Sequence, residues 1–239
     1  VLNNLSHEVR FNMGECRTDP GGYFIIDGKE KVIVTQEQFS DNIIYIQENT
    51  NDIYSHSAKI RSVSEDASKP IRTLAVRLVE EQPTSINQQI VVAIPNVRKP
   101  VPLFIVMRAL GVISDKEIIE YCLLDIDKYE NMVELFRSSV HDAGEIFTQQ
   151  AALKYISSFT KGGGGGKNTY KALEVLTLYF LPHIGERNFK QKALFLGYMT
   201  KKLLKVSSKI DKPTNRDSYL YKRFLVSGKL IYDLFLEYY

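Results

Sequence analysis

The spacing of apolar residues changes near Pro102 to the three- and four-residue steps of helices, and this change limits the possible folds most. Before it, β-branched and aromatic residues gather in short runs that are typical of strands. After it, apolar residues recur at helical steps, as Leu196, Met199 and Leu203 do. The sequence therefore predicts an α+β fold, with a β-rich N-terminal part that contains hairpins and a mostly helical C-terminal part.

The N-terminal part contains a strong hairpin signal at Asp27-Gly28. Both residues tolerate positive φ, and they separate two strand-like runs at 23–26 and 31–35. Polar, turn-rich stretches at 65–70 and 80–85 are typical of connections. Further strands are predicted at 42–47, 54–63, 71–79 and 89–94.

Helical periodicity and capping signals divide the C-terminal part into segments. Ser114 precedes Asp115, and Glu117 stands three residues after Ser114, which is a capping-box pattern. The predicted helices cover 102–110, 114–123, 128–142, 147–160, 169–183, 189–208 and 217–238.

Five consecutive glycines at 162–166 separate two of these predicted helices. A phosphate-binding loop needs two spaced glycines followed by Lys-Ser/Thr after a strand, and here Lys167 is followed by Asn168. A glycine run has maximal backbone freedom, so we expect a linker. The sequence leaves open whether this linker is native or engineered.

Residues that usually carry chemistry are scattered. None of His7, His56, His141 and His183 stands at metal-ligand or triad spacing, and no cluster of Asp residues resembles a magnesium site. Neither Cys16 nor Cys122 has a His or Cys at metal-ligand spacing, so we expect no zinc site built from this chain alone. A disulfide between them stays open, but two isolated cysteines are more often buried thiols. We therefore expect no catalytic residue, no metal and no cofactor in this chain.

The formal charge of +3 is too small to indicate a nucleic-acid partner, but the positive charge is unevenly distributed. Between Gly185 and Arg216, nine Lys and Arg residues face two acids, a local balance of 9 − 2 = +7. Such a stretch attracts phosphate without reading base sequence, although a solvated helix face is the commoner role. The aromatic residues within it, Phe189, Phe195 and Tyr198, are predicted to pack inward.

No segment suits a membrane. The longest apolar run, 101–110, contains Pro102 and Arg108 and is too short to span a bilayer, and the first ten residues lack a signal-peptide core. We expect a soluble, intracellular protein without a membrane partner. The chain begins without Met and ends inside a helical pattern, which indicates a fragment of a larger protein.

Six segments of the chain form an ordered series of motifs. They are 19–37 (DPGGYFIIDGKEKVIVTQE), 55–63 (SHSAKIRSV), 105–114 (IVMRALGVIS), 180–184 (FLPHI), 192–204 (KALFLGYMTKKLL) and 216–228 (RDSYLYKRFLVSG). In this order they resemble the second-largest subunit of multisubunit RNA polymerases, with the polymerase II type the most similar, and the first resembles a hairpin of that family. Lys59 replaces an acid of the family strand, and Tyr221 and Leu225 also depart from the family pattern.

The resemblance implies a lobe domain inserted into a protrusion domain. Residues 1–47 would end the protrusion, 48–210 would form the lobe, and 211–239 would return to the protrusion as a helix. In the family these domains form one wall of the DNA cleft. The resemblance thus implies a structural role within a DNA-directed RNA polymerase, a nucleotidyltransferase whose magnesium and zinc are bound elsewhere in the assembly.

The implied partners are DNA, the DNA–RNA hybrid and other polymerase subunits. The expected location is the nucleus for a cellular protein, or a cytoplasmic viral factory or virion for a protein of a large DNA virus. The residues expected near nucleic acid are the hairpin lysines, three helical lysines and a pair near the C-terminus, as phosphate-positioning contacts. They are Lys29, Lys31, Lys201, Lys202, Lys205, Lys222 and Arg223.

Two other functions stay open on sequence grounds. One is a free-standing α+β protein-interaction module, which would have the same fold. A reading frame ending near Tyr239 would favour this module, whereas a frame of about a thousand residues with a downstream zinc-binding segment would favour the polymerase. A nucleotide-handling enzyme is disfavoured, because no phosphate loop or metal cluster is present.

Overall fold

The computed structural model describes residues 4–48, 53–66, 68–81, 88–160 and 169–239. The chain forms two compact units. The small unit combines Val1–Phe39 with Lys222–Tyr239, and the large unit is Ser40–Tyr221. These boundaries differ from the expected divisions after residues 47 and 210, and the names protrusion and lobe stay predictions. The glycine run at 162–166 lies outside the described residues.

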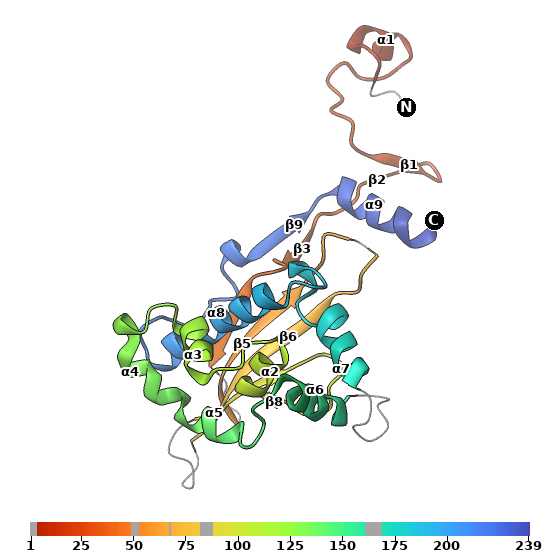
Figure 1. Cartoon of the computed structure of the whole chain (residues 1–239). Helices are drawn as coiled ribbons and strands as arrows, with labels where there is room; N and C mark the ends of the chain where they lie inside the picture. Colours follow the sequence, from red (N-terminus) through yellow and green to blue (C-terminus); the bar gives the residue numbers. More distant parts are fainter. Residues whose placement is uncertain (1–3, 49–52, 67, 82–87, 161–168) are drawn as a thin grey trace. The chain divides into compact units, whose positions relative to one another are not determined.

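An antiparallel five-stranded sheet runs through the large unit, in the order β4-β5-β6-β7-β8 (Figure 1). Side chains alternate between its two faces, so the aligned pairs Ile60–Leu74 and Ala58–Val76 point to one face, where all four are at most 1% exposed. The strands are β4 (Ile44–Glu48), β5 (Tyr54–Ser62), β6 (Arg72–Val79), β7 (Ile90–Ala93) and β8 (Val101–Pro102).

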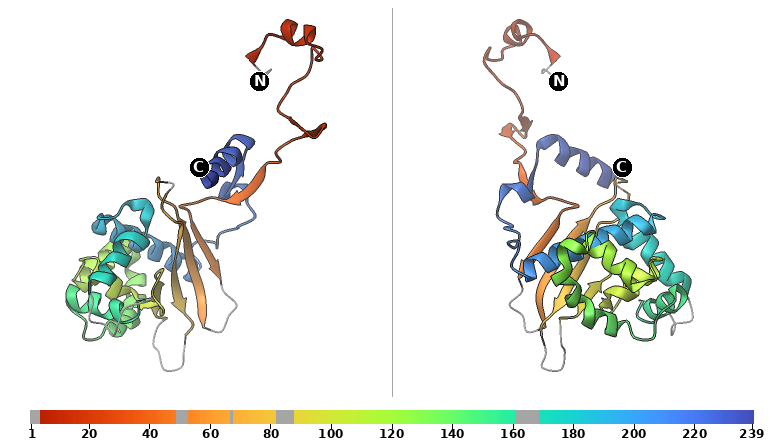
Figure 2. Two further views of the ribbon diagram at one scale, coloured as in Figure 1. Left: turned by 90° about the vertical axis from the view of Figure 1, so that its right-hand side faces the viewer. Right: turned by 60° about the vertical axis from the view of Figure 1, so that its left-hand side comes forward.

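The helices of the large unit cover this apolar face and leave the other face of the sheet without helices (Figure 2). The longest, α8 (Phe189–Ser207), packs against β4, β5 and β6 and against α3 (Asp115–Leu123), while α2 (Leu103–Ala109) lies against β7 and β8. The remaining α-helices are α4 (Glu130–Val133), α5 (Arg137–Asp142), α6 (Gln149–Ser158) and α7 (Thr169–Glu174).

Gly197 allows α8 and α3 to approach closely. A Cβ atom at this position would lie 2.3 Å from the carbonyl oxygen of Tyr121, so a residue larger than glycine would push the helices apart. On either side of it, Leu196 and Met199 are fully buried. The apolar stripe predicted from the sequence is therefore confirmed as the core face of α8.

The small unit contains α1 (His7–Asn12), two short two-stranded sheets and α9 (Ser227–Tyr238). Ser6 caps α1, with its Oγ accepting from the Val9 N–H. One sheet is the hairpin of β1 (Phe24–Ile26) and β2 (Lys29–Lys31), and the other pairs β3 (Gln36–Phe39) with β9 (Lys222–Leu225).

The α+β class is confirmed, whereas the predicted helix at 217–238 is wrong in its first half. That segment contains a 3-10 turn (Tyr219–Tyr221), then β9, and only then α9. Pairing of β9 with β3, far away in sequence, provides the backbone hydrogen bonds that a helix would otherwise make. The second strand of the hairpin also begins earlier than predicted, at Lys29, because its turn has only two residues.

Other predicted helices are interrupted. The segment 128–142 alternates short α-helices with 3-10 turns at Asp127–Tyr129 and Glu134–Phe136. The segment 169–183 changes after Glu174 into a π-helical stretch, Val175–Tyr179. It ends before Pro182, whose ring disfavours right-handed helical geometry at the preceding residue, and Leu181 is left-handed with φ 48°. Ser114 does stand at the N-cap of α3, but its side chain makes no capping hydrogen bond. The capping-box prediction is wrong in that respect.

Candidate nucleic-acid interface

The hairpin of β1 and β2 presents two of the predicted lysines. Asp27 and Gly28 both have positive φ, 53° and 70°, as a tight two-residue hairpin turn requires. The register pairs Ile26 with Lys29 and Phe24 with Lys31, so the two lysines share one face of the ribbon. Both lysines are exposed.

The acid between these lysines lies on the opposite face of the hairpin. Glu30 pairs with Ile25, one residue out of phase with Lys29 and Lys31. No ion pair of either lysine is present among the described residues. The hairpin therefore offers two ammonium groups that point the same way, with their charges unopposed by Glu30.

A hydrogen-bonded turn leads into the hairpin. The Tyr23 hydroxyl donates to Asp19 Oδ2 at 2.6 Å, and the Gly21 N–H donates to Oδ1 at 2.8 Å. These two bonds lower the pKa of Asp19, and the bond to Asp19 raises the pKa of Tyr23 to about 12. Asp19 stays ionised at neutral pH, and both of its carboxylate oxygens accept hydrogen bonds within the turn, which holds the turn in place.

Lys222 and Arg223 lie on strand β9, whereas the sequence predicted a helix there. The Lys222 ammonium pairs with Glu37 of β3 and lies 5.7 Å from the centre of the Phe39 ring. Arg223 is exposed, opposite Gln38, and its guanidinium donates to the Lys222 carbonyl at 2.7 Å. Successive strand residues face opposite ways, so the two cations do not form one patch.

The three helical lysines lie on α8, and each contacts an aromatic ring. Lys201 donates to the carbonyl oxygen of Leu123, at the end of α3, at 2.7 Å, and its ammonium lies 4.4 Å from the Tyr129 ring centre. Lys205 lies 5.3 Å from the same ring and 3.9 Å from the Asp211 carboxylate, and Lys202 lies 4.9 Å from the Tyr198 ring.

Lys201 and Lys205 have a structural role, because their contacts fasten α8 to the end of α3 and to the turn after it, whereas Lys202 contacts a ring of its own helix. All three are half-buried, so less of their charge faces solvent than the +7 balance of the segment indicates. Phe189 and Phe195 pack against the core as predicted, but Tyr198 is 39% exposed and its predicted inward packing is wrong. Lys202 shields that exposed ring.

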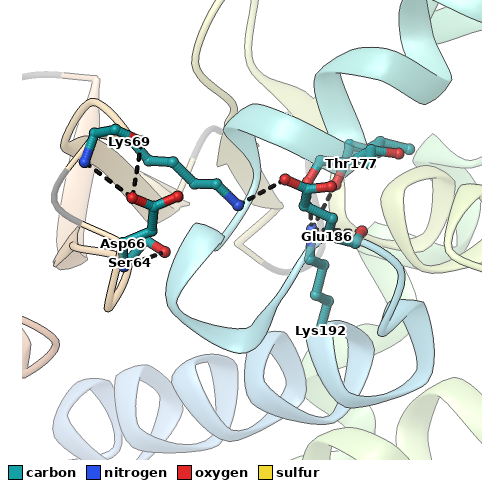
Figure 3. Close-up of polar contacts among 8 residues, drawn as sticks. Ser64, Asp66, Lys69, Thr177, Glu186 and Lys192 are labelled. Carbon is teal, nitrogen blue, oxygen red and sulfur yellow. Dashed lines mark hydrogen bonds and ion pairs between the residues drawn. The ribbon is translucent and has the colours of Figure 1, made fainter.

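Lys192, counted among the nine basic residues of the segment, is completely buried. Its ammonium donates to the carbonyl oxygens of Leu176 at 2.8 Å, Thr177 at 2.9 Å and Glu186 at 3.3 Å (Figure 3). Burial lowers its pKa to about 8, and the charge of Glu186 partly opposes that shift. Lys192 thus joins the π-helical stretch after α7 to the loop before α8.

The Glu186 side chain extends this contact to the sheet. It accepts from the Lys69 ammonium at 2.6 Å, and Lys69 lies in the turn between β5 and β6, where Asp66 accepts from Ser68 (Figure 3). This hydrogen bond lowers the pKa of Glu186 and raises that of Lys69. Both side chains are more than one-third exposed, so the pair contributes little to stability.

His183 belongs to this region but shows no catalytic arrangement. Its backbone N–H donates to Ser62 Oγ at 3.3 Å, and the same hydroxyl is 2.7 Å from His183 Nδ1. Burial, and then the charge of Lys192, lower the pKa of the imidazole. Since Phe195 packs edge-on against the ring, His183 is a packed, hydrogen-bonded histidine.

The family model "RNA polymerase Rpb2, domain 2" matches residues 31–225. The chain belongs to the RNA polymerase Rpb2 family. It is 40% identical over 240 residues to DNA-directed RNA polymerase II subunit RPB2 of Encephalitozoon cuniculi and 33% identical to that of Schizosaccharomyces pombe, with 98% of this chain covered in both cases. The archaeal subunit Rpo2 of Saccharolobus solfataricus is 34% identical over 227 residues.

The chain spans about a fifth of the length of these Rpb2 relatives, since the matches cover 20%, 20% and 19% of the three proteins. The predicted family is therefore confirmed. Among the described residues, no three His, Cys, Asp or Glu side chains gather as they would around a metal ion. No described helix has the length and apolarity needed to cross a membrane.

Sequence reasoning missed the basic residues of the central sheet. Lys59 on β5 and Arg77 on β6 point to the face that carries no helices, because they alternate with the core residues Ile60 and Leu78. The available signal was the alternation of apolar and basic residues within the two predicted strands. This alternation could be interpreted only once the register of β5 with β6 was known, because the register places the two cations on neighbouring strands.

Proposed function

We propose that the chain is a structural part of the second-largest subunit of a DNA-directed RNA polymerase, where it forms part of the wall of the DNA cleft and helps to position DNA and the DNA–RNA hybrid. The family match over residues 31–225 carries this proposal. The relatives are subunits of RNA polymerases, and those from several eukaryotes are subunits of polymerase II. A nuclear location and contacts with other polymerase subunits follow from the same proposal.

The hairpin lysines suit a backbone contact. Lys29 and Lys31 are exposed, lie on one face of a hairpin with a two-residue turn and face away from Glu30. Cations held in this way neutralise phosphates and position a duplex without reading its bases. Arg223 is the better candidate of the C-terminal pair, because its side chain is exposed whereas Lys222 is half-buried.

The helical lysines contribute to this function indirectly. Lys201 and Lys205 pack on Tyr129 and hold α8 in place, so their first effect is on the shape of the large unit. The nucleotide-transfer chemistry, with its magnesium, and the zinc sites would belong to other parts of the assembly. The chain itself then supplies rigidity and positive charge and no reacting group.

The proposal is tested in polymerase assembled with the full-length subunit that carries this chain. The double variant Lys29→Glu/Lys31→Glu should shorten the lifetime of the elongation complex as salt is raised, because two phosphate contacts become repulsive. The rate of single-nucleotide addition in complexes that remain intact should not change. Lys190→Glu, an exposed lysine of α8, is the control.

Two outcomes would contradict the proposal. One is an unchanged lifetime at every salt concentration in the hairpin variant. The other is a large fall in the rate of nucleotide addition with unchanged DNA retention, since that would assign a reacting role to this region.

A further inference from the structure

The face of the central sheet that carries no helices is basic. Residues of β4, β5, β6 and β7 that point to this face alternate with the core residues. None of these positions within the four strands is an acid. They are Tyr45 and Gln47 on β4, Ser57, Lys59 and Arg61 on β5, Thr73, Ala75, Arg77 and Val79 on β6, and Val91 and Ala93 on β7.

Lys59 and Arg77 are diagonal neighbours at the centre of this face. Lys59 is aligned with Ala75 and Arg77 with Ser57, so the two cations stand on adjacent strands, two residues apart. Diagonal neighbours of this kind lie about 7–8 Å apart. The small residues Ser57 and Ala75 fill the other corners and are buried, whereas Lys59 and Arg77 are half-buried, so the two cations are the accessible part of this patch.

Charge compensation on this face is incomplete. Asp41 pairs with Arg61 at 3.1 Å. No ion pair of Lys59 or Arg77 is present among the residues that the structure describes. The Arg77 guanidinium lies 5.0 Å from the Tyr54 ring centre, a contact that orients the cation without neutralising it.

The segment before β9 adds positive charge at the edge of the same face. The Arg216 guanidinium lies 5.9 Å from the Tyr45 ring centre, and Tyr45 is aligned with Lys59 across β4 and β5. The Tyr45 hydroxyl donates to the carbonyl oxygens of Ser40 at 2.8 Å and Tyr221 at 3.1 Å, which fixes the ring. From the β4 edge across β5 to β6, the cations on this face are therefore Arg216, Lys59 and Arg77.

We propose that this sheet face binds the sugar-phosphate backbone of duplex DNA, with Lys59 and Arg77 as its central contacts. The inference extends the proposed function and partly rests on it, since it names a second DNA-facing surface in the large unit. The complementarity of a polyanion with a cationic face, on which the four strands place no acid and Asp41 pairs with Arg61 alone among the described residues, supports it.

A protein partner fits this surface less well than a phosphate backbone. Protein interfaces draw most of their affinity from aromatic or aliphatic side chains seated in desolvated pockets. Here the centre consists of the buried small residues Ser57 and Ala75 and of two half-buried cations, and Tyr45 is 7% exposed. Flat, cationic surfaces of this kind position a backbone without reading sequence.

The experiment measures binding of the 239-residue chain to a short fluorescein-labelled duplex by fluorescence anisotropy, between about 50 and 200 mM salt. The variants are Lys59→Glu and Arg77→Glu, and the resembled family strand carries an acid at position 59, so a folded variant is expected. Lys154→Glu, an exposed lysine of α6 in the helical layer, is the control with the same change in net charge. Far-UV circular dichroism verifies that every variant is folded.

We expect each sheet variant to weaken binding by about 5–30-fold at the lower salt concentration and to reduce the logarithmic salt slope by about 1, as the loss of one phosphate contact does. The control should change affinity much less. Equal effects of Lys59→Glu and Lys154→Glu would overturn the inference, because only net charge would then matter.

A poly-glutamate competitor and the variant Lys31→Glu separate the remaining outcomes. If Lys59→Glu abolishes binding to poly-glutamate but leaves duplex binding unchanged, the face serves an acidic protein segment and the inference fails. If Lys59→Glu has no effect while Lys31→Glu weakens duplex binding, the sheet-face inference fails and the proposed function stands. If only the sheet variants weaken it, the hairpin contact fails instead.

Discussion

Replacing the buried Lys192 by methionine should destabilise the large unit, by an amount that grows with pH. Methionine keeps the unbranched shape of the side chain and removes the ammonium. The carbonyl oxygens of Leu176, Thr177 and Glu186 then lose a shared donor. Leu176 and Thr177 lie in the π-helical stretch and Glu186 in the loop before α8, so the loss is concentrated at the contact between these two segments.

The size of the effect at neutral pH follows from two opposing contributions. Leaving a buried carbonyl without a donor costs about 1–3 kcal/mol, and three are affected, of which those of Thr177 and Glu186 are only partly buried. Removing a buried ammonium relieves a desolvation penalty of several kcal/mol. We expect a net loss of about 2–4 kcal/mol in the free energy of unfolding for Lys192→Met.

The pH dependence follows from the lowered pKa. Burial places the pKa of folded Lys192 at about 8, against about 10.4 in an unfolded chain. Between these values the unfolded state binds more protons, so the stability of the wild type rises with pH in this window. The variant lacks the group, and the stability difference should widen by on the order of 3 kcal/mol between about pH 8 and 10.4.

Urea denaturation followed by far-UV circular dichroism measures both effects, since the chain has no tryptophan to report by fluorescence. Lys190→Met, an exposed lysine on the same helix, controls for the loss of charge and should leave stability almost unchanged. A wild-type minus Lys192→Met difference that is flat or falls as pH rises would refute the reasoning. Such a result would show that the three carbonyl hydrogen bonds stabilise the ammonium as well as water does, so that burial does not lower the pKa of Lys192.

Four further predictions follow from the packing and the chemistry. Gly197→Ala should lower the free energy of unfolding by about 1–3 kcal/mol or more, because the new Cβ would lie 2.3 Å from the backbone oxygen of Tyr121. Gly228→Ala, whose Cβ would meet open space, should be neutral or stabilising, and urea titration measures both variants. Lys201→Glu should cost about 1–2 kcal/mol in stability before any DNA is added, which thermal melting detects, and an unchanged melting temperature would show that its contacts are not structural. One thiol, that of Cys16, should react rapidly with a disulfide reagent in native protein and a second, that of Cys122, only in urea; two rapid equivalents would contradict the packing, which raises the pKa of Cys122 by burial. The purified chain should not incorporate nucleotides on a DNA template with magnesium, and incorporation that a single acidic substitution abolishes would contradict its structural role.

The sequence predicts well those elements whose pattern is set locally. The helix predicted at 189–208 is observed at Phe189–Ser207, because its apolar stripe and its burial share one period. The strands predicted at 54–63 and 71–79 are β5 and β6. Cys122 is buried as expected, but Cys16 is exposed, since it lies in the small unit, where few side chains are buried.

Features that depend on distant partners could not be predicted. The segment at 222–225 is a strand only because β3 lies beside it, and no local signal indicates that pairing. The charge balance of the 185–216 segment counts every lysine as an equally accessible positive charge. In the structure Lys192 is inside the protein, Lys201 and Lys205 stack on Tyr129, and others are exposed. Positive charge in a sequence therefore indicates a possible DNA contact only after its intramolecular partners are known.

Site-specific crosslinking most directly tests the claim that this chain faces DNA inside a polymerase. A photoreactive amino acid would be placed at position 31 of the full-length subunit, with a second at position 154 as a control, and elongation complexes would be irradiated on labelled template. The account predicts a crosslink to DNA from position 31 and none from position 154. Crosslinks from position 31 only to protein subunits, in complexes that transcribe normally, would contradict it.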